Sequence, residues 1–164
     1  MRRYLVVANQ TLGGEELWVV IRERMGSGDC HFHLVVPATP GGQQDARDAE
    51  GPDHEEARRL LEHELDDAGT GAGEDLGRRL ARERMRSQLD RMRELGASVS
   101  GEIGVADPVD AVRVVLHRWE FDEVILSTLP GRRSRWLAAD LPTKIRRGSR
   151  LPVTQITGAT AAKR

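Results

Sequence analysis

The chain has 164 residues, of which 38% are hydrophobic and 31% are charged, and its formal net charge is -1. This length fits one domain, residues 1–164, and the near-neutral charge argues against a nucleic-acid partner, because nucleic-acid-binding domains carry a clustered basic excess. A single cysteine excludes an internal disulfide framework, and no apolar run approaches the roughly 18 residues of a membrane span. We therefore expect one cytoplasmic domain without membrane insertion.

The first third of the chain alternates between strand and helix patterns. The continuous apolar run Tyr4–Ala8 is typical of a parallel strand that helices cover on both faces. Apolar residues at helical spacing then predict a helix over about residues 14–25, which ends near Gly26. Residues 31–36 form a second apolar run, so a second strand follows this helix.

Residues 38–72 differ from the segments on either side. They are rich in Gly, Pro, Gln and Asp and have no sustained periodicity, although the charged stretch 54–65 is compatible with a short helix. The segment is predicted to be a flexible or partly helical insertion. It precedes a longer amphipathic helix that Gly96 ends.

The next strand and helix have clear local signals. Apolar and polar residues alternate over residues 98–103, which predicts a strand with one drier face, as expected at a sheet edge. Asp107 can accept the free N–H groups of a helix start, Pro108 suits the first helical position, and Asp110 complements the helix dipole. A helix is therefore expected to begin at Pro108.

The remaining elements complete the pattern. Residues 124–126 are a buried strand, a short helix is expected around residues 135–147 with an interruption at Pro142, and a last strand covers residues 153–157. Strands that alternate with helices imply parallel pairing through right-handed crossovers. The fold class is therefore α/β, a Rossmann-like, doubly wound, five-stranded parallel sheet of order 3-2-1-4-5 with helices on both faces.

In such a sheet, ligands bind beyond the carboxyl ends of the strands, where successive crossovers go to opposite sides. That point lies here between the first and fourth strands. Arginine side chains after the fourth strand could form charge-assisted hydrogen bonds to phosphate or carboxylate, or they could be solvated surface residues beside a serine that caps a helix. The predicted ligand-binding residues are Asn9, Thr11, Val36, Ser127, Thr128, Arg132, Arg133, Ser134 and Arg135.

Two histidines and the cysteine are the other candidates for chemistry. His31 and His33 share one strand face, as a metal-binding pair would, but no carboxylate or third histidine has a helpful spacing. We expect satisfied strand histidines and no metal. Cys30 is expected to pack as a small hydrophobic residue, because no basic neighbour in the sequence would lower its pKa.

Three short stretches, spread over almost the whole chain, carry a family resemblance. They are Val7-Ala8-Asn9-Gln10-Thr11, Asp107-Pro108 followed by Asp110, and Leu151-Pro152-Val153. Their order and spacing resemble those of the universal stress protein family, in which the first strand ends in Asp-Gly-Ser, a helix begins with Gly-Asp-Pro and Cys-Pro-Val leads into the last strand.

The resemblance implies a Rossmann-like domain, a homodimer joined through the last strand, Val153–Thr157, and in one branch ATP bound at the switch point. That branch carries Gly-x2-Gly-x9-Gly-Ser after the fourth strand. The corresponding positions here are Ser127, Pro130, Asp140 and Leu141, and none of them matches. Pro130 has no N–H to donate to phosphate, and Asp140 adds negative charge. The chain therefore resembles a diverged member.

The sequence predicts a regulatory or ligand-sensing module without chemistry of its own, because the sequence contains no nucleophile-elbow, Walker-type or His-Glu-x-x-His motif. An anionic or nucleotide ligand, such as ATP or another adenine nucleotide, would occupy the crevice between the first and fourth strands. One alternative is an ATP-binding, weakly ATP-hydrolysing protein that uses the loop arginines in place of glycines. Another is a structural dimer that binds a protein partner through residues 40–72 and no ligand.

Overall fold

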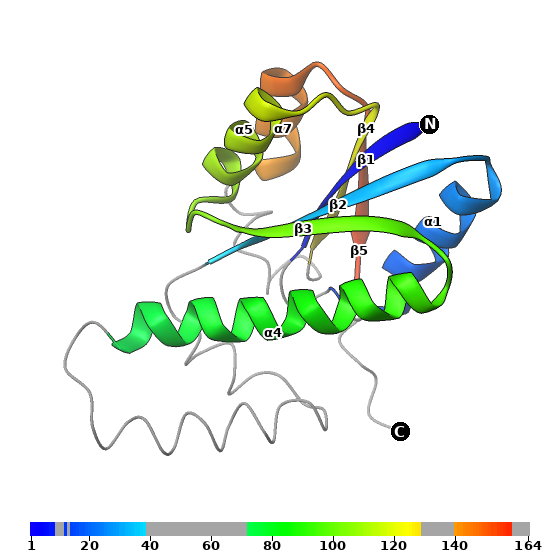
Figure 1. The fold of residues 1–164 in the computed structure, drawn as a ribbon. Helices are drawn as coiled ribbons and strands as arrows, with labels where there is room; N and C mark the ends of the chain where they lie inside the picture. The colour runs from blue at the N-terminus through cyan, green and yellow to red at the C-terminus, as the bar shows by residue number, and fades with distance from the viewer. Residues whose placement is uncertain (9–11, 13, 39–71, 129–139, 159–164) are drawn as a thin grey trace.

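A computed structural model describes residues 1–8, 12, 14–38, 72–128 and 140–158, with the backbone alone for 72–77 and 80 (Figure 1). The elements of this part are β1 (Arg2–Val7), α1 (Glu15–Gly26), β2 (Cys30–Pro37), α4 (Ala72–Glu94), β3 (Ser98–Gly104), α5 (Pro108–Arg118), β4 (Glu123–Thr128), α7 (Leu141–Ser149) and β5 (Val153–Thr157). The strands form one parallel sheet of order β3-β2-β1-β4-β5, which confirms the predicted fold class.

Helices cover the sheet on both faces, with α1 and α4 on one side and α5 and α7 on the other (Figure 1). Because successive strand residues point to opposite faces, the buried run of β1 divides between two cores. Tyr4 and Val6 pack with α1 and α4, whereas Leu5 and Val7 pack with α5 and α7. This is why the run is continuously apolar rather than alternating.

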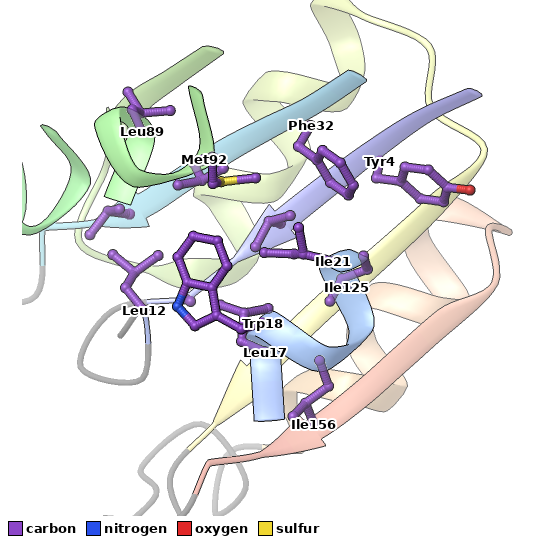
Figure 2. Close-up of a cluster of buried hydrophobic side chains, with 14 of the residues drawn as sticks. Tyr4, Leu12, Leu17, Trp18, Ile21, Phe32, Leu89, Met92, Ile125 and Ile156 are labelled. Carbon is purple, nitrogen blue, oxygen red and sulfur yellow. The ribbon is translucent and has the colours of Figure 1, made fainter. Parts of the chain in front are cut away.

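Large side chains fill the core beneath α1 and α4 (Figure 2). The rings of Tyr4 and Phe32 stack with their centroids 5.3 Å apart across β1 and β2. Trp18 of α1 and Met92 of α4 are each 1% exposed and join the two helices over the sheet. Burying a side chain of this size stabilises the fold by about 1.5–3 kcal/mol.

The start of α5 agrees with its sequence signals. The Asp107 side chain accepts a hydrogen bond from the backbone N–H of Asp110 at 3.0 Å, and Pro108 occupies the first turn. The helix approaches β3 closely, since a Cβ added at Gly104 would lie 2.6 Å from the Cβ of Ala111. Gly104 therefore allows α5 to pack against the carboxyl end of the sheet.

Most strands and helices begin or end within about two residues of the expected positions, and two of the differences have a clear physical reason. β1 begins at Arg2 rather than Tyr4, because the backbone N–H of Arg2 donates to the Asp29 carbonyl at 2.9 Å and extends the strand beyond its apolar run. Pro142 does not interrupt α7 but lies in its first turn, where the missing proline N–H needs no partner.

Other expectations lie outside the described residues. They concern residues 39–71 of the predicted insertion and the part of the short helix before Asp140. Among the helices that the structure describes, none combines the length and the apolar composition of a membrane span.

Candidate functional site

The topology gives the sheet its switch point between β1 and β4. β1 pairs with β2 on one side and with β4 on the other. The crossovers through α1 and α4 pass over one face, and those through α5 and α7 pass over the opposite face. The connections therefore diverge at the carboxyl ends of β1 and β4, which is where ligands bind in open α/β sheets.

Three of the predicted ligand-binding residues lie at this edge. Val7 of β1 is in register with Val35 of β2 and Leu126 of β4, so the residues that follow, Val36 and Ser127, flank the end of β1. The Val36 side chain is fully buried in the core beneath α1 and α4. Thr128 comes next after Ser127 at the end of β4.

Thr128 joins β4 to its neighbour. Its Oγ1 donates to the Ile156 carbonyl at 3.5 Å, and its own carbonyl accepts from the N–H of Gly158 at 2.8 Å. Both contacts run to β5 or the residue just beyond it. The hydroxyl of Thr128 is thus already engaged in holding the edge together.

Ser127 differs from Thr128 in this respect. Its side chain is 1% exposed, and its Oγ has no hydrogen-bond partner within the described parts of the chain. Leaving a buried hydroxyl unpaired costs about 1–3 kcal/mol, so such groups usually bond to ordered water or to a ligand. The Ser127 hydroxyl is therefore a polar group available at the switch point.

The backbone before α7 has a conformation that glycine adopts without strain. Asp140 has φ 54° and ψ 41°, in the left-handed region that L-residues rarely occupy. Its exposed side chain makes no capping hydrogen bond. Leu141 is 1% exposed and packs beneath α5 and α7, so this position contributes to the core rather than to a polar site.

The remaining predicted site residues cannot be located in the same way. Six of them lie outside the described residues, and these are Asn9, Thr11, Arg132, Arg133, Ser134 and Arg135. Of the predicted set, the structure brings together the carboxyl-end residues of β2 and β4 on either side of β1.

At the amino end of the sheet, a charged cluster joins α1 to β4 and β5. The Arg24 guanidinium donates to both carboxylate oxygens of Glu123, at 2.9 and 3.1 Å, and Thr154 donates to the same carboxylate. Burial raises the pKa of Glu123, but the hydrogen bonds from Arg24 and Thr154, together with the charges of Arg24 and Arg2, lower it overall. The cluster connects helices and strands that are distant in the sequence. No local sequence pattern predicts such contacts.

The two histidines belong to a chain of hydrogen bonds across β2 and β3. His31 contacts Ser98 and Ser100 at 2.8 Å each, and His33 contacts Ser100 at 2.7 Å and Glu102 at 3.3 Å. Arg118 of α5 donates to the other oxygen of Glu102. The expectation of satisfied strand histidines is confirmed by these contacts.

The Glu102 carboxylate determines which atom donates and which accepts in each of these hydrogen bonds. Because the Glu102 carboxylate accepts, Nε2 of a neutral His33 carries the proton and Nδ1 accepts from Ser100. The Ser100 oxygen then accepts from Nε2 of His31, whose Nδ1 accepts from Ser98. A single assignment of donors and acceptors therefore satisfies every side chain in this series of hydrogen bonds.

Burial and nearby positive charges favour the neutral form of both histidines. Burial is the largest influence on the pKa of His33 and lowers it, the Glu102 carboxylate opposes this, and with the Arg118 and Arg3 charges the pKa is lowered overall. Burial and the charge of Arg3 also lower the pKa of His31. Within the described ranges, no three potential ligands cluster as a metal site requires.

Cys30 lies partly buried at the start of β2 and packs against the core beneath α1 and α4. Burial raises the pKa of its thiol, and the charge of Asp29 raises it further. A raised pKa disfavours the reactive thiolate.

Comparison with known proteins gives two informative likenesses, although no protein-family model and no curated protein sequence matches the chain. A universal stress protein family protein from Arabidopsis thaliana, solved with AMP bound, is 12% identical, with a TM-score of 0.56 over 97% of this chain and 93% of that one. A universal stress protein from Archaeoglobus fulgidus is 10% identical, with a TM-score of 0.50 over 96% and 94%. With its five parallel strands in the order β3-β2-β1-β4-β5, the chain has the fold of the universal stress proteins.

Proposed function

We propose that the chain is a regulatory module of the universal-stress-protein type that binds an adenine nucleotide, or a similar anionic ligand, between β1 and β4. The observation that carries the proposal is the buried hydroxyl of Ser127 at the switch point, which has no hydrogen-bond partner among the residues that the structure describes. The Arabidopsis thaliana protein of the same fold has AMP bound. A ribose hydroxyl or phosphate oxygen on the ligand would give Ser127 its missing partner.

The charges at this edge favour a ligand with few phosphates. α7 follows the carboxyl end of β4 and leads back to the start of β5, so the positive end of its dipole lies toward the carboxyl edge of the sheet. The Asp140 carboxylate at that helix start opposes a phosphate, and Pro142 removes one N–H from the first turn. We therefore expect AMP to bind at least as tightly as ATP.

Isothermal titration with AMP, ADP and ATP tests the proposal. AMP should bind to the wild-type protein, and Ser127→Ala should weaken that binding about tenfold, because a hydrogen bond to a phosphate or ribose oxygen is lost. Arg82 and Arg86 are two exposed arginines of α4, and their substitution is a control for changes in the nucleotide affinity that do not arise at the switch point. Arg82→Ala/Arg86→Ala should leave the affinity unchanged. Absence of binding for all three nucleotides at millimolar concentration would contradict the proposal.

The same titration separates the ATP-hydrolysing alternative. If loop arginines replace the missing glycines, ATP should bind more tightly than AMP, and Arg132→Ala/Arg133→Ala should abolish the difference. A phosphate-release assay on the wild-type protein then tests hydrolysis directly. AMP binding that survives this double substitution favours the regulatory module.

The edge of the sheet supports a homodimer as part of the proposal. β5 is the terminal strand next to β4, and within the described residues no strand pairs with its outer edge. An unpaired parallel edge offers backbone groups to a second copy across a two-fold axis. Light scattering should give twice the monomer mass. A monomer at micromolar concentration would contradict this part, while the nucleotide titration would still decide the ligand site.

A further inference from the structure

A cleft lies on the side of the sheet that α5 and α7 cover. It has a volume of about 720 Å³ and opens between these two helices. It runs along α5 from Val109 and reaches the amino ends of β1 and β4, where Arg3 and Asp122 line it, at the opposite end of the strands from Ser127. Its volume falls within the range of about 300–1,000 Å³ that is usual for small-molecule sites.

The lining of this cleft mixes apolar and aromatic side chains with polar and charged ones. Among the apolar ones, Leu116 and the half-exposed Trp119 come from α5 and the residue after it, Phe121 from the turn before β4, and Ile145 from α7. An aromatic group that lies against this part of the lining would cover it from water. The hydrophobic effect then contributes to binding, and the polar groups fix the orientation of the ligand.

The guanidinium of Arg3 supplies hydrogen-bond donors on the same cleft. Its guanidinium lies 5.4 Å from the ring centroid of Trp119 and 5.5 Å from that of Phe121, so two aromatic rings hold it. Its backbone N–H donates to Asp122 at 2.8 Å. Among the described residues, no carboxylate lies within ion-pair distance of the guanidinium, whose planar fork matches a carboxylate.

The other charged side chains of the lining balance the charge of Arg3. Lys144 of α7 is exposed and has no ion-pair partner in the described part of the chain, whereas Arg113 pairs with Asp110 at 3.1 Å. The carboxylates on the lining are Glu120 and Asp122. Within the described residues, Arg3 and Lys144 are the arginine and lysine side chains of the lining that have no ion pair, so an anion is attracted mainly to them.

We propose that the cleft between α5 and α7 is a binding site for a small aromatic carboxylate. The ring system lies against the apolar walls and Trp119, and the carboxylate accepts two hydrogen bonds from the Arg3 guanidinium. Lys144 adds attraction at the rim. Tight binding therefore requires both parts of the ligand. A neutral aromatic compound forms no ion pair with Arg3, and a small anion leaves the apolar part of the lining in contact with water.

Arg3 also connects this site to the histidine chain. Its positive charge lowers the pKa of both His31 and His33. A carboxylate bound to the guanidinium neutralises that charge locally, so it should raise both pKa values. The histidines therefore report whether an anion sits on Arg3 rather than elsewhere on the protein.

The probe for this site is 2-naphthoate, with 2-naphthalenemethanol as the neutral analogue and acetate as the anion without an apolar body. Titrations followed by amide chemical shifts should give binding of naphthoate, at least about tenfold weaker binding of the alcohol, and no saturable binding of acetate. Naphthoate should also raise the pKa of His31 and His33 in proton NMR titrations. AMP should not displace it, because the two sites lie at opposite ends of the strands.

Substitutions localise the interaction. Arg3→Gln keeps much of the side-chain length, removes the charge and should weaken naphthoate binding about tenfold. Arg22→Gln, at an exposed position of α1, is the matched control and should leave the affinity unchanged. Equal affinity for naphthoate and its alcohol, or unchanged histidine pKa values in the saturated wild-type protein, would overturn the proposal even if Arg3→Gln failed to fold.

Discussion

The two ends of the strands are held together by different forces. At the carboxyl end, close contact between Gly104 and Ala111 and hydrogen bonds from Thr128 define the edge, and those contacts are uncharged. At the amino end, Arg24 and Glu123 form a partly buried ion pair. Among the described residues, the contacts at the carboxyl end therefore depend mainly on shape, whereas those at the amino end depend on charge. This difference predicts which substitutions and conditions each end tolerates.

The largest effect should follow from added volume at the carboxyl end. Gly104→Ala brings a Cβ within 2.6 Å of the Ala111 Cβ and 3.1 Å of Val35, so α5 must shift. We expect a loss of about 3 kcal/mol in the free energy of unfolding, measured by urea denaturation. Gly148→Ala in α7 is the control, since its added Cβ meets no atom within 4 Å. Equal effects of the two changes would contradict a shape-limited edge.

The ion pair at the amino end should give the next largest effect. Glu123→Gln removes the charge that Arg24 and Thr154 contact, and we expect a loss of about 2 kcal/mol in the free energy of unfolding. Asp90→Asn, which removes an exposed partner of Arg93, should change it by at most about 0.5 kcal/mol. If urea denaturation gives the same small value for both, the pair contributes no more than a surface contact.

The histidine chain should make stability depend on pH. The native pKa of His33 lies below its ordinary value of 6.5, so the unfolded chain takes up a proton first as the pH falls. The stability that neutral His33 contributes is therefore fully present above about pH 6.5 and is lost as the pH falls from there to the native pKa. In this window the free energy of unfolding should fall by at most about 1.4 kcal/mol per pH unit, the value for uptake of one proton.

Denaturation curves between pH 8 and pH 5 should show this loss in the wild-type protein. His33→Gln should reduce the slope, because a neutral amide replaces the titrating ring. His117→Gln, at an exposed position of α5, should leave the slope unchanged. A slope that His33→Gln does not reduce would assign the pH dependence to other groups.

The smallest change in stability should come from relief of backbone strain before α7. Asp140→Gly removes the side chain from a residue at φ 54° and should raise the free energy of unfolding by about 0.5–1 kcal/mol. Arg150→Gly is the control, because Arg150 has φ 58° at the other end of the same helix. Both should stabilise the protein, but only Asp140→Gly should tighten AMP binding. A similar change in affinity for both would contradict a role for the Asp140 charge.

The fold was largely predictable because its signals are local. Continuous apolar runs identified the central strands, and Asp107 with Pro108 announced the start of α5. The strand order then followed from alternation and handedness rules. The expected interruption at Pro142 was wrong because proline is found both at helix starts and at helix breaks. The helix begins only after the left-handed residue Asp140, so Pro142 lies in its first turn.

The sites were less predictable because they depend on contacts between distant residues. His31 meets Ser98 only because β2 and β3 pair in one register, and a shift by one residue would have turned the serine to the opposite face. Arg24 and Glu123 are 99 residues apart in the sequence. The topology alone predicts Ser127 as a ligand-binding residue. That its hydroxyl has no partner among the described residues depends on packing, which the sequence does not show.

A titration with AMP followed by amide chemical shifts tests the central claim most directly, since it compares the two ends of the strands in one experiment. Shifts should concentrate at Val7, Ala8, Ser127 and Thr128, which lie at the carboxyl ends of β1 and β4. Amides at the α5–α7 cleft, such as Leu116 and Phe121, should not move. No shifts at millimolar AMP, or shifts confined to the cleft, would contradict nucleotide binding at the switch point.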